Sequence, residues 1–589
     1  MEIMADFRPL VLLVQLPIPP PGAEPVRGNV PLAAGYLKLF ARRRGLEEAY
    51  RIEILPPALA NTLGDQGLVE EILSRRPWMV GFTCYLWNIE RTLWIAQRLK
   101  QSEPGLRVLL GGPEVTADNP WVLQHPAVDY AIIGEGEQTL AELLAALRQS
   151  ADPALAIPGL HKAGGGLPPR RVPLVGLETI GSPYTEGLLD AAEEKLLLLE
   201  TARGCRYRCK YCYYAKSYDT ICYLSSEQID ASLRHANDCG VAEVFLLDPT
   251  LNQRPDFAGF LRRLACGNPE RRFTYSAELR AEGIDAATAR LLREANFKEV
   301  EVGLQSVDSR TQRLMGRPVH LADFERGAKA MLDEGIAVRV DLILGLPGDT
   351  PDTIRRGIEY LDIVRPFSEL QIFNLSILPG TEFRRESEKL GLEFQRRPPY
   401  YVLETPTLDA EQMRQLMAEA QDALGIEFDA PAAPRLLGES MGRTLAAHCT
   451  VDLDARLADA VLPAPGRRTQ AFTLWLRAAD FHARRHEAAA LAARLLADNP
   501  HTTLQVVLEP TGELHRVTPE ALETLLAECY RTPSYLDWYY SLHPGRFLGA
   551  KRLVVAAPAA ERGRATPAWI EAVEQCATIV WLEDTTRQG

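Results

Sequence analysis

The segment LLLLETARGCRYRCKYCYYAK, residues 196–216, places three cysteines shortly after an apolar strand. Cys205, Cys209 and Cys212 are spaced C-x-x-x-C-x-x-C, and ten cysteines scattered over 589 residues would give this pattern by chance only about 0.003 times. Structural zinc normally takes four closing ligands, and the sequence contains no second C-x-x-C. Three thiolates leave one corner of a cuboidal iron–sulfur cluster open to a substrate. The spacing therefore predicts a [4Fe–4S] cluster bound by these three cysteines.

Cationic side chains surround the triplet. They either favour the thiolate form of the cysteines and offset the negative charge of a cluster, or they belong to a solvated basic loop. Cys222, ten residues beyond Cys212, is expected either near the cluster or in a buried packing position. The four cations are Arg203, Arg206, Arg208 and Lys210.

Apolar strand-like runs alternate with helices through residues 195–430. The clearest helix spans 321–335, where apolar residues recur every three or four positions and Gly335 supplies a stop. Six parallel strands are too few to close an eight-stranded barrel, so this block predicts an open, partial (β/α)6 TIM-like barrel with the cysteines at its strand-end face. The expected strands are KLLLLETA (195–202), EVFLLDPT (243–250), FTYSAELR (273–280), EVEVGLQS (299–306), AVRVDLILGLPG (337–348) and LQIFNLSILPG (370–380).

Residues 1–150 also alternate strand and helix signals, which predicts a doubly wound, Rossmann-like α/β domain that binds its ligand at the carboxyl ends of its strands. The Gly- and Pro-rich run KAGGGLPPRRVP (162–173) predicts a linker over residues 151–194. The expected strands of the first domain are LVLLVQLP (10–17), YRIEILP (50–56), WMVGFTCY (78–85), RVLLGGPEV (107–115) and DYAIIGEGE (129–137).

Residues 431–589 predict a small C-terminal α/β region without a catalytic motif, which could close over the substrate. Its aromatic segment SYLDWYYSLHPGRF (534–547) could line a pocket or belong to the core. Further strands are expected in TTLQVVLE (502–509), RLVVAAPA (552–559) and TIVWLED (578–584), and an amphipathic helix through Leu474, Ala478, Phe481, Ala488, Leu491 and Leu495.

Composition limits the class of protein. A net charge of −13 argues against general nucleic-acid binding, because phosphate neutralisation needs a basic surface. Ten cysteines, mostly scattered singly, fit a reducing cytosol rather than a disulfide scaffold. The start, MEIMADFRPLVLLVQLPIPPPG, is typical of a first strand rather than a signal peptide, and no run approaches the roughly 18 apolar residues of a membrane span. We therefore expect a cytoplasmic protein with no nucleic-acid or membrane partner.

The triplet, with Tyr211 before its last cysteine, resembles the signature of the radical S-adenosylmethionine (SAM) family, in which the open iron chelates SAM. Short matches follow in order along the chain, and the resemblance implies SAM contacts there, although each polar residue could instead cap a strand end or serve a structural hydrogen bond. The implied contacts are Tyr211, Asp248 and Pro249 in LLDPTLN, Glu278 in SAELR for the ribose hydroxyls, Gln305 and Ser306 in GLQS, and Leu346 and Pro347 in DLILGLPG.

A doubly wound domain ahead of such a core, from about residue 9 to 430, is similar to the cobalamin-dependent branch of this family. No D-x-H-x-x-G loop is present and the first histidine is His125, so we expect no histidine lower ligand to cobalt. Each implied contact has an alternative, since the glycines could serve turn geometry alone and the aromatic residues could belong to the core. The implied cobalamin contacts are Gly111, Gly112, Pro113 and Glu114, then Gly134 and Gly136, with Tyr85, Leu86 and Trp87 beneath the ring.

The resemblance implies a C-methyltransferase that methylates an unactivated carbon through methylcobalamin and a 5′-deoxyadenosyl radical. A cyclase or rearrangement enzyme that uses the same cofactors without methyl transfer is the second hypothesis. A protein that senses cobalamin or redox state is the third. The expected partners are a small-molecule or peptide substrate and a one-electron reductant of the flavodoxin or ferredoxin type.

Overall fold

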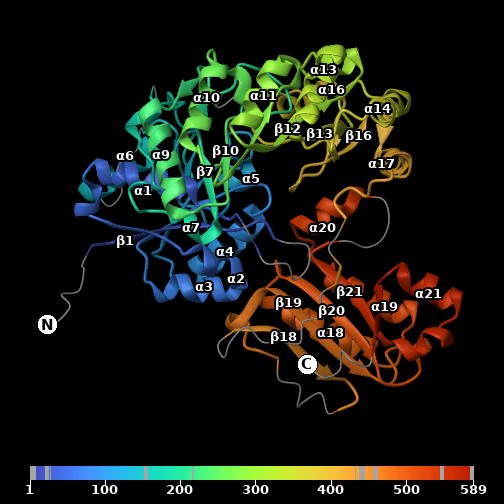
Figure 1. The fold of residues 1–589 in the computed structure, drawn as a ribbon. Helices are drawn as coiled ribbons and strands as arrows, with labels where there is room; N and C mark the ends of the chain where they lie inside the picture. Colours follow the sequence, from blue (N-terminus) through green and yellow to red (C-terminus); the bar gives the residue numbers. More distant parts are fainter. Residues whose placement is uncertain are drawn as a thin grey trace.

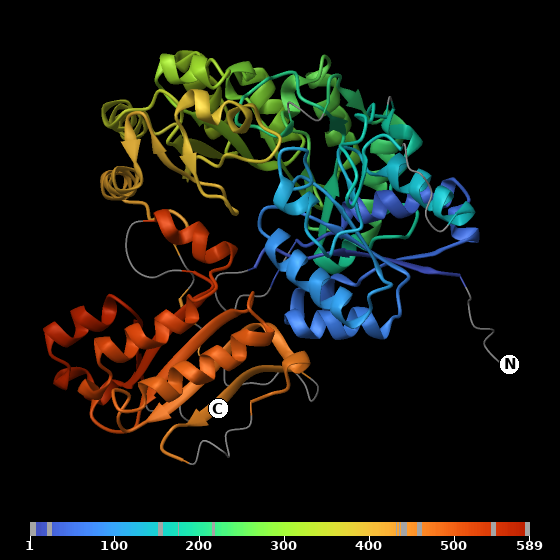
Figure 2. The same cartoon turned by 180° about the vertical axis from the view of Figure 1, so that it is seen from behind.

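The computed structural model contains three α/β bodies that follow one another along the chain (Figure 1). The second body, green to yellow, arches over the first, which is blue, and over the C-terminal body, which is orange to red; Figure 2 shows the same arrangement from behind. The structure describes residues 8–583 apart from 20–25, 27, 151–156, 175, 215–217, 431–432, 435, 437–444, 456–461 and 544–548.

The first body confirms the doubly wound prediction. Its sheet has the order β2-β1-β3-β4-β5-β6, with all neighbours parallel except β5 and β6. One buried cluster packs α1 and α6 on one face, and another packs α3 and α4 on the other. Strand β6 lies within the expected linker and adds an antiparallel edge to the sheet. The elements are β1 (Leu10–Gln15), α1 (Leu32–Arg43), β2 (Arg51–Ile54), α2 (Pro57–Thr62), α3 (Asp65–Ser74), β3 (Met79–Thr83), α4 (Ile89–Ser102), β4 (Arg107–Gly111), α5 (Pro120–Leu123), β5 (Tyr130–Ile132), α6 (Glu137–Gln149) and β6 (Leu160–Lys162).

The second body is the predicted open barrel. Six parallel strands run in the order β14-β13-β12-β11-β10-β7, so β7 and β14 are its two edges. Apolar side chains face the surrounding helices, whereas β12 and β13 direct polar side chains to the inner face. The elements are β7 (Leu196–Leu199), α9 (Ser226–Cys239), β10 (Glu243–Leu246), α10 (Phe257–Gly267), β11 (Thr274–Leu279), α11 (Ala286–Glu294), β12 (Phe297–Gln305), α12 (Ser309–Leu314), α13 (Leu321–Asp333), β13 (Ala337–Leu344), α14 (Pro351–Val364) and β14 (Glu369–Asn374).

Two smaller additions complete this body. The short antiparallel pair β8 (Ala202–Arg203) and β9 (Cys222–Tyr223) encloses the cysteine loop. After β14, a three-stranded antiparallel sheet and α17 extend the barrel. This extension comprises α15 (Glu382–Arg385), α16 (Ser387–Leu390), β15 (Glu393–Phe394), β16 (Val402–Thr405), β17 (Leu408–Asp409) and α17 (Ala410–Leu424).

The C-terminal body is a parallel sheet of order β18-β19-β20-β21-β22. The helix predicted to begin near Leu474 is wrong in its first half, because Leu474 and Ala478 lie in a strand and the helix begins at Arg485. An i, i+4 spacing also satisfies the two-residue period of a strand, so these residues fit both patterns. The elements are β18 (Ala446–Asp452), β19 (Arg468–Ala478), α18 (Arg485–Asp498), β20 (Thr503–Pro510), α19 (Pro519–Cys529), α20 (Tyr535–Tyr539), β21 (Lys551–Pro558), α21 (Pro567–Glu574) and β22 (Thr578–Leu582).

The C-terminal body is joined to the first by backbone contacts. Leu63 and Thr469 form an isolated antiparallel bridge, and the Gly64 amide donates to the Arg468 carbonyl at 2.9 Å. Within the described ranges, every helix is too short or too polar to span a lipid bilayer.

Candidate functional site

The three cysteines lie on the loop between β8 and β9 and line one cavity at the carboxyl ends of the barrel strands. None of these three cysteines is in a disulfide bond, and Cys209 is the most enclosed, with 5% of its surface exposed. The cavity and the solvent-open space at its mouth together measure about 700 Å³. Its other lining residues are Tyr207, Tyr211, Tyr214, Pro249, Thr250, Glu278, Leu279, Arg280, Glu301, Gly303, Gln305, Arg317 and Asp341.

A guanidinium that was not predicted, that of Arg317, lies close to one of the cluster ligands. Its Nη1 lies 3.9 Å from Cys209 Sγ, and its Nη2 donates to the Gly303 carbonyl at 2.5 Å. Two of the expected cations have other partners: Lys210 Nζ lies 3.0 Å from Glu382, and Arg203 binds glutamates. Arg317 comes three residues after α12 (Ser309–Leu314), and no local sequence pattern marks it.

Gln305 ends β12 in a conformation that favours glycine, with φ of 67°. Its side chain folds back over Gly303, where any Cβ would lie 2.1 Å from Gln305 Nε2. Within the described residues the buried Oε1 of Gln305 has no hydrogen-bond partner. An unusual backbone and an unsatisfied oxygen at the cavity wall together indicate a ligand position.

Carboxylates from three adjacent strands form one wall of the cavity: Glu278 on β11, Glu301 on β12 and Asp341 on β13. Enclosure by the barrel raises the pKa of Glu278 to about 7, and the nearby charge of Glu301 adds to the effect. Burial, followed by Glu301, raises the pKa of Asp341 far above its usual range. Glu301 and Asp341 were not predicted, although the alternation of polar residues along β12 and β13 signalled a polar inner face.

Asp248 lies beneath the loop rather than among the cavity-lining residues. Its Oδ1 accepts hydrogen bonds from the Thr201 and Ala202 amides at 2.8 and 3.0 Å, and its Oδ2 accepts one from the Thr201 hydroxyl at 2.6 Å. Burial raises the pKa of Asp248 to about 6, while these hydrogen bonds oppose that shift. Asp248 therefore fixes the segment between β7 and β8, and its neighbour Pro249 lines the cavity.

Ser306, Leu346 and Pro347 are buried in the turns after β12 and β13 and are not among the cavity-lining residues. The Ser306 hydroxyl accepts a hydrogen bond from the Asp308 amide, and the Leu346 amide donates to Asp349 Oδ2 at 3.0 Å. These contacts shape the strand-end turns.

The glycine pair after β4 lies against the end of β3. Gly112 has φ of +108°, and a Cβ there would lie 2.6 Å from the Cys84 carbonyl oxygen, so backbone packing alone requires glycine. Glu114 is buried and accepts hydrogen bonds from the Tyr400 hydroxyl at 2.6 Å and from Asn119 Nδ2 at 3.2 Å. Burial raises the pKa of Glu114 to about 7. The segment that contains Gly111 and Pro113 thus meets the barrel extension through Glu114.

The half-buried loop Tyr85, Leu86 and Trp87 follows β3. The rings of Tyr85 and Trp87 stack with centroids 4.4 Å apart and an interplanar angle of 6°. Asn88 fixes the loop, because its Oδ1 accepts from the Tyr85 amide at 2.8 Å and its Nδ2 donates to the Leu16 carbonyl at 3.0 Å.

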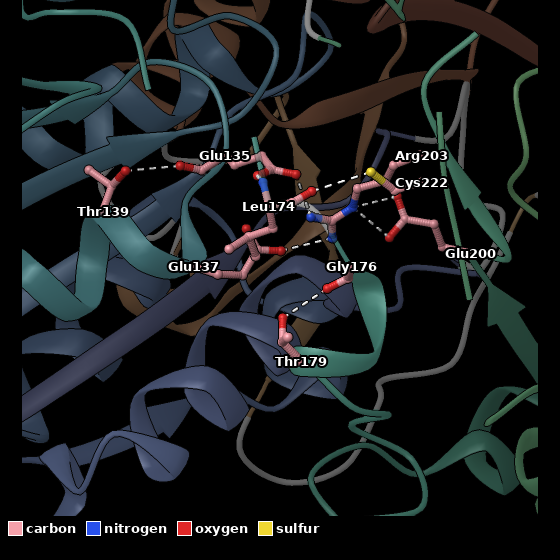
Figure 3. A network of polar contacts seen from close by, with 9 residues as sticks. All are labelled: Glu135, Glu137, Thr139, Leu174, Gly176, Thr179, Glu200, Arg203 and Cys222. Carbon is pink, nitrogen blue, oxygen red and sulfur yellow. Dashed lines mark hydrogen bonds and ion pairs between the residues drawn. The ribbon is translucent and has the colours of Figure 1, made fainter. Parts of the chain in front are cut away.

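The turn after β5 contacts the base of the cysteine loop (Figure 3). Gly134 has φ of +91° with no atom within 4 Å of an added Cβ, and Gly136 precedes α6. Arg203 Nη1 lies 2.9 Å from Glu135 Oε1, and its Nη2 lies 2.8 Å from Glu137 Oε1. Glu135 and Glu137 were not predicted as functional. Cys222, in the same view, donates from Sγ to the Leu174 carbonyl at 3.3 Å, which is a packing role rather than a cavity position.

The C-terminal aromatic segment packs against the end of the barrel body. The Tyr539 hydroxyl donates to Asp429 Oδ2 at 2.6 Å, and the Tyr539 ring lies 6.0 Å from that of Tyr401. Described residues of this segment are not among those lining the cysteine cavity, and residues 544–547 lie outside the described ranges.

The chemistry of this donor set fits an iron–sulfur cluster better than a single ion. Across the described chain, no three His, Cys, Asp or Glu side chains converge on a single-ion site, whereas the three cysteines of the loop line one cavity. Gln305, with its unsatisfied oxygen, and Glu278 line the same cavity from adjacent strands. Gly134 is exposed just after β5, and no atom lies within 4 Å of an added Cβ there.

Comparison with known families gives two matches. Residues 199–361 match the radical SAM superfamily and residues 29–144 match the B12 binding domain. The cofactors of the chain are therefore a [4Fe–4S] cluster, SAM and cobalamin.

Two curated relatives match the chain at low identity. The 2-(S-pantetheinyl)-carbapenam-3-carboxylate methyltransferase of Streptantibioticus cattleyicolor is 26% identical over 64% of this chain and 58% of its own length. The cobalamin-dependent radical SAM methyltransferase TokK of Streptomyces tokunonensis is 26% identical over 66% of this chain and 60% of its own. The chain thus spans about three fifths of these relatives. The radical SAM methyltransferase TsrM of Kitasatospora setae, solved with tryptophan and a SAM analogue, has the same fold, with a TM-score of 0.53 at 18% identity over 67% of this chain and 80% of that chain.

Proposed function

Because the chain joins a B12-binding domain to a radical SAM domain, as the cobalamin-dependent radical SAM enzymes do, we propose that it is a C-methyltransferase acting on an unactivated carbon. The observation that carries the proposal is the contact between the two cofactor regions. Arg203, at the base of the cysteine loop, binds Glu135 and Glu137 in the strand-end turn of the first body. When bound, the cluster with SAM supplies a hydrogen-abstracting radical and cobalamin supplies the methyl group.

Residues of the cavity have separate roles. Cys205, Cys209 and Cys212 would hold three irons, and Arg317 would offset the negative charge of the thiolates from its position 3.9 Å from Cys209 Sγ. Gln305 and Glu278, on adjacent strands, would orient SAM through its ribose and amino acid groups. The aromatic rings of the lining would exclude water, which protects a reactive radical from side reactions.

The relatives support a small-molecule substrate, since one of them is named for a carbapenam carboxylate and the other is named as a methyltransferase. A peptide substrate is the alternative. A one-electron donor of the flavodoxin or ferredoxin type in the cytoplasm would reduce the cluster.

The test does not require the substrate. Anaerobically reconstituted protein with hydroxocobalamin, SAM carrying a CD₃ methyl group and titanium(III) citrate is analysed by mass spectrometry. The expected products are S-adenosylhomocysteine, about one equivalent per cobalamin in the first turnover, and 5′-deoxyadenosine. The Cys209→Ala variant should form no 5′-deoxyadenosine.

The same assay separates the alternatives. Formation of 5′-deoxyadenosine without S-adenosylhomocysteine would favour a cyclase or rearrangement enzyme. Formation of neither product would favour a sensing protein and would overturn the proposed activity.

A further inference from the structure

We propose that Arg203 is a positioning residue that couples cobalamin binding in the first body to the geometry of the cysteine loop, an inference that rests on the proposed function for the identity of the two cofactors. Arg203 lies two residues before Cys205, yet it is not among the residues that line the cavity, and its guanidinium binds Glu135 and Glu137 of the first body (Figure 3). It thereby connects two regions that are far apart in the sequence.

The guanidinium of Arg203 is bound on all of its donor sides. Nη1 lies 2.9 Å from Glu135, Nη2 lies 2.8 Å from Glu137, and Nε lies 2.9 Å from Glu200 Oε1. The side chain of Arg203 is 7% exposed, and those of Glu135 and Glu137 are 5% and 7% exposed. A buried, planar guanidinium with several partners is held in a more fixed orientation than a side chain in a single surface ion pair.

The backbone of Arg203 defines the base of the cysteine loop. Arg203 pairs with Cys222 in the β8–β9 ladder, which closes the loop between them. Gly204 follows with φ of +99°, and a Cβ there would lie 2.5 Å from the Thr220 carbonyl oxygen, so the base has little freedom to shift. A movement of Arg203 is therefore transmitted to Cys205.

Arg203, Glu135, Glu137 and Glu200 form one network of ion pairs. Its other end is the turn that the family resemblance implies in cobalamin binding. Glu135 and Glu137 flank Gly136, and Gly134 precedes them at the carboxyl end of β5. The Leu174 amide donates to Glu135 Oε2 at 2.6 Å, and the Thr139 hydroxyl donates to the Glu135 carbonyl at 3.0 Å. A ligand seated on this turn therefore shifts the carboxylates that hold Arg203.

The network depends on the positive charge of Arg203. Three carboxylates surround one guanidinium, so removal of the cation leaves three like charges close together with little exposure. Removal of one carboxylate is a milder change, because two anionic partners remain.

The test measures the dissociation constant of hydroxocobalamin by equilibrium dialysis for protein with and without its reconstituted cluster and SAM. Wild type should show a difference of about fivefold or more between the two states, and Arg203→Gln should show a ratio near one. The electron paramagnetic resonance spectrum of the reduced cluster should respond to hydroxocobalamin in wild type and not in Arg203→Gln.

Arg171→Gln is the matched control. The side chain of Arg171 is also 7% exposed, and it binds Glu142 on α6 and the Pro158 carbonyl rather than the turn that holds Arg203. It should keep the wild-type ratio. If Arg203→Gln does not fold, Glu137→Gln replaces it and should give an intermediate ratio.

A wild-type ratio of one, or a ratio unchanged in both network variants, would overturn the coupling. Neither measurement depends on methyl transfer. Coupling without methylated product would count against the proposed function alone, and methylation without coupling would count against the role of Arg203 alone.

Discussion

The sulfur of Cys222 differs from those of the triplet in what it contacts. Cys209 lines the cavity beside Arg317, whereas Cys222 donates to the Leu174 carbonyl at 3.3 Å. We expect Cys209→Ala to lower the iron content after reconstitution from about four per chain to near zero. Cys222→Ala should retain the cluster and lose about 1 kcal/mol of stability. Iron and sulfide analysis with the visible spectrum distinguishes the two, and a cluster retained in Cys209→Ala would exclude it as a ligand.

Asp248 is a strand-end carboxylate, and its substitution distinguishes a structural role from a role in SAM binding. Asparagine has a single acceptor oxygen, so Asp248→Asn cannot reproduce the three hydrogen bonds to Thr201 and Ala202 and leaves Arg254 without its anion. We expect a loss of about 2–3 kcal/mol in thermal unfolding, with the SAM dissociation constant of the folded protein unchanged. Weakened SAM binding without loss of stability would instead show that Asp248 contacts SAM.

At the scale of elements, the turns after β4 and β5 contain glycines with different constraints. A Cβ on Gly112 would lie 2.6 Å from the Cys84 backbone, whereas one on Gly134 would meet no atom within 4 Å. Gly112→Ala should therefore destabilise the first body by about 3 kcal/mol. Gly134→Ala should cost about 1 kcal/mol of stability but weaken hydroxocobalamin binding about tenfold, because its added methyl would face the cofactor. Unchanged cobalamin affinity in Gly134→Ala would remove this turn from the cobalamin site.

Helices and strands could be predicted from the sequence where a single local hydrophobic pattern determined them. The strands of the first two bodies were recognisable because buried parallel strands are nearly continuous apolar runs. The helix expected to begin at Leu474 failed because a long strand buried on both faces has no helix-specific period. Glu278 and Gln305, which line the cavity, were predicted only through the family resemblance, whereas Arg317 and Glu137 depend on packing between segments far apart in the sequence.

At the scale of the whole molecule, charged side chains hold the three bodies together. Asp65 at the start of α3 accepts from Arg91 Nε at 2.7 Å and from the His501 amide of the C-terminal body at 2.8 Å. Gln395 of the barrel extension donates to Ser541 of the C-terminal body at 3.1 Å. Burial lowers the pKa of His501 to about 4, so this histidine is neutral at the junction at physiological pH.

Glu90, on α4 near this junction, makes the junction sensitive to pH. Among the described residues its buried Oε2 has no hydrogen-bond partner, and burial raises its pKa to about 7, although Arg397 and Lys551 oppose the shift. A folded-state pKa above the unfolded value means that protonation stabilises the fold below about pH 4.5, and this contribution is lost as pH rises through about 7. Glu90→Gln should therefore be more stable than wild type by about 1–3 kcal/mol at pH 8 and nearly equal to it at pH 4.5. Melting temperatures at the two pH values measure the difference, with Glu103→Gln at the exposed end of the same helix as the control. An equal gain at both pH values would show that lost packing or hydrogen bonding, rather than the charge of Glu90, sets the stability of the junction.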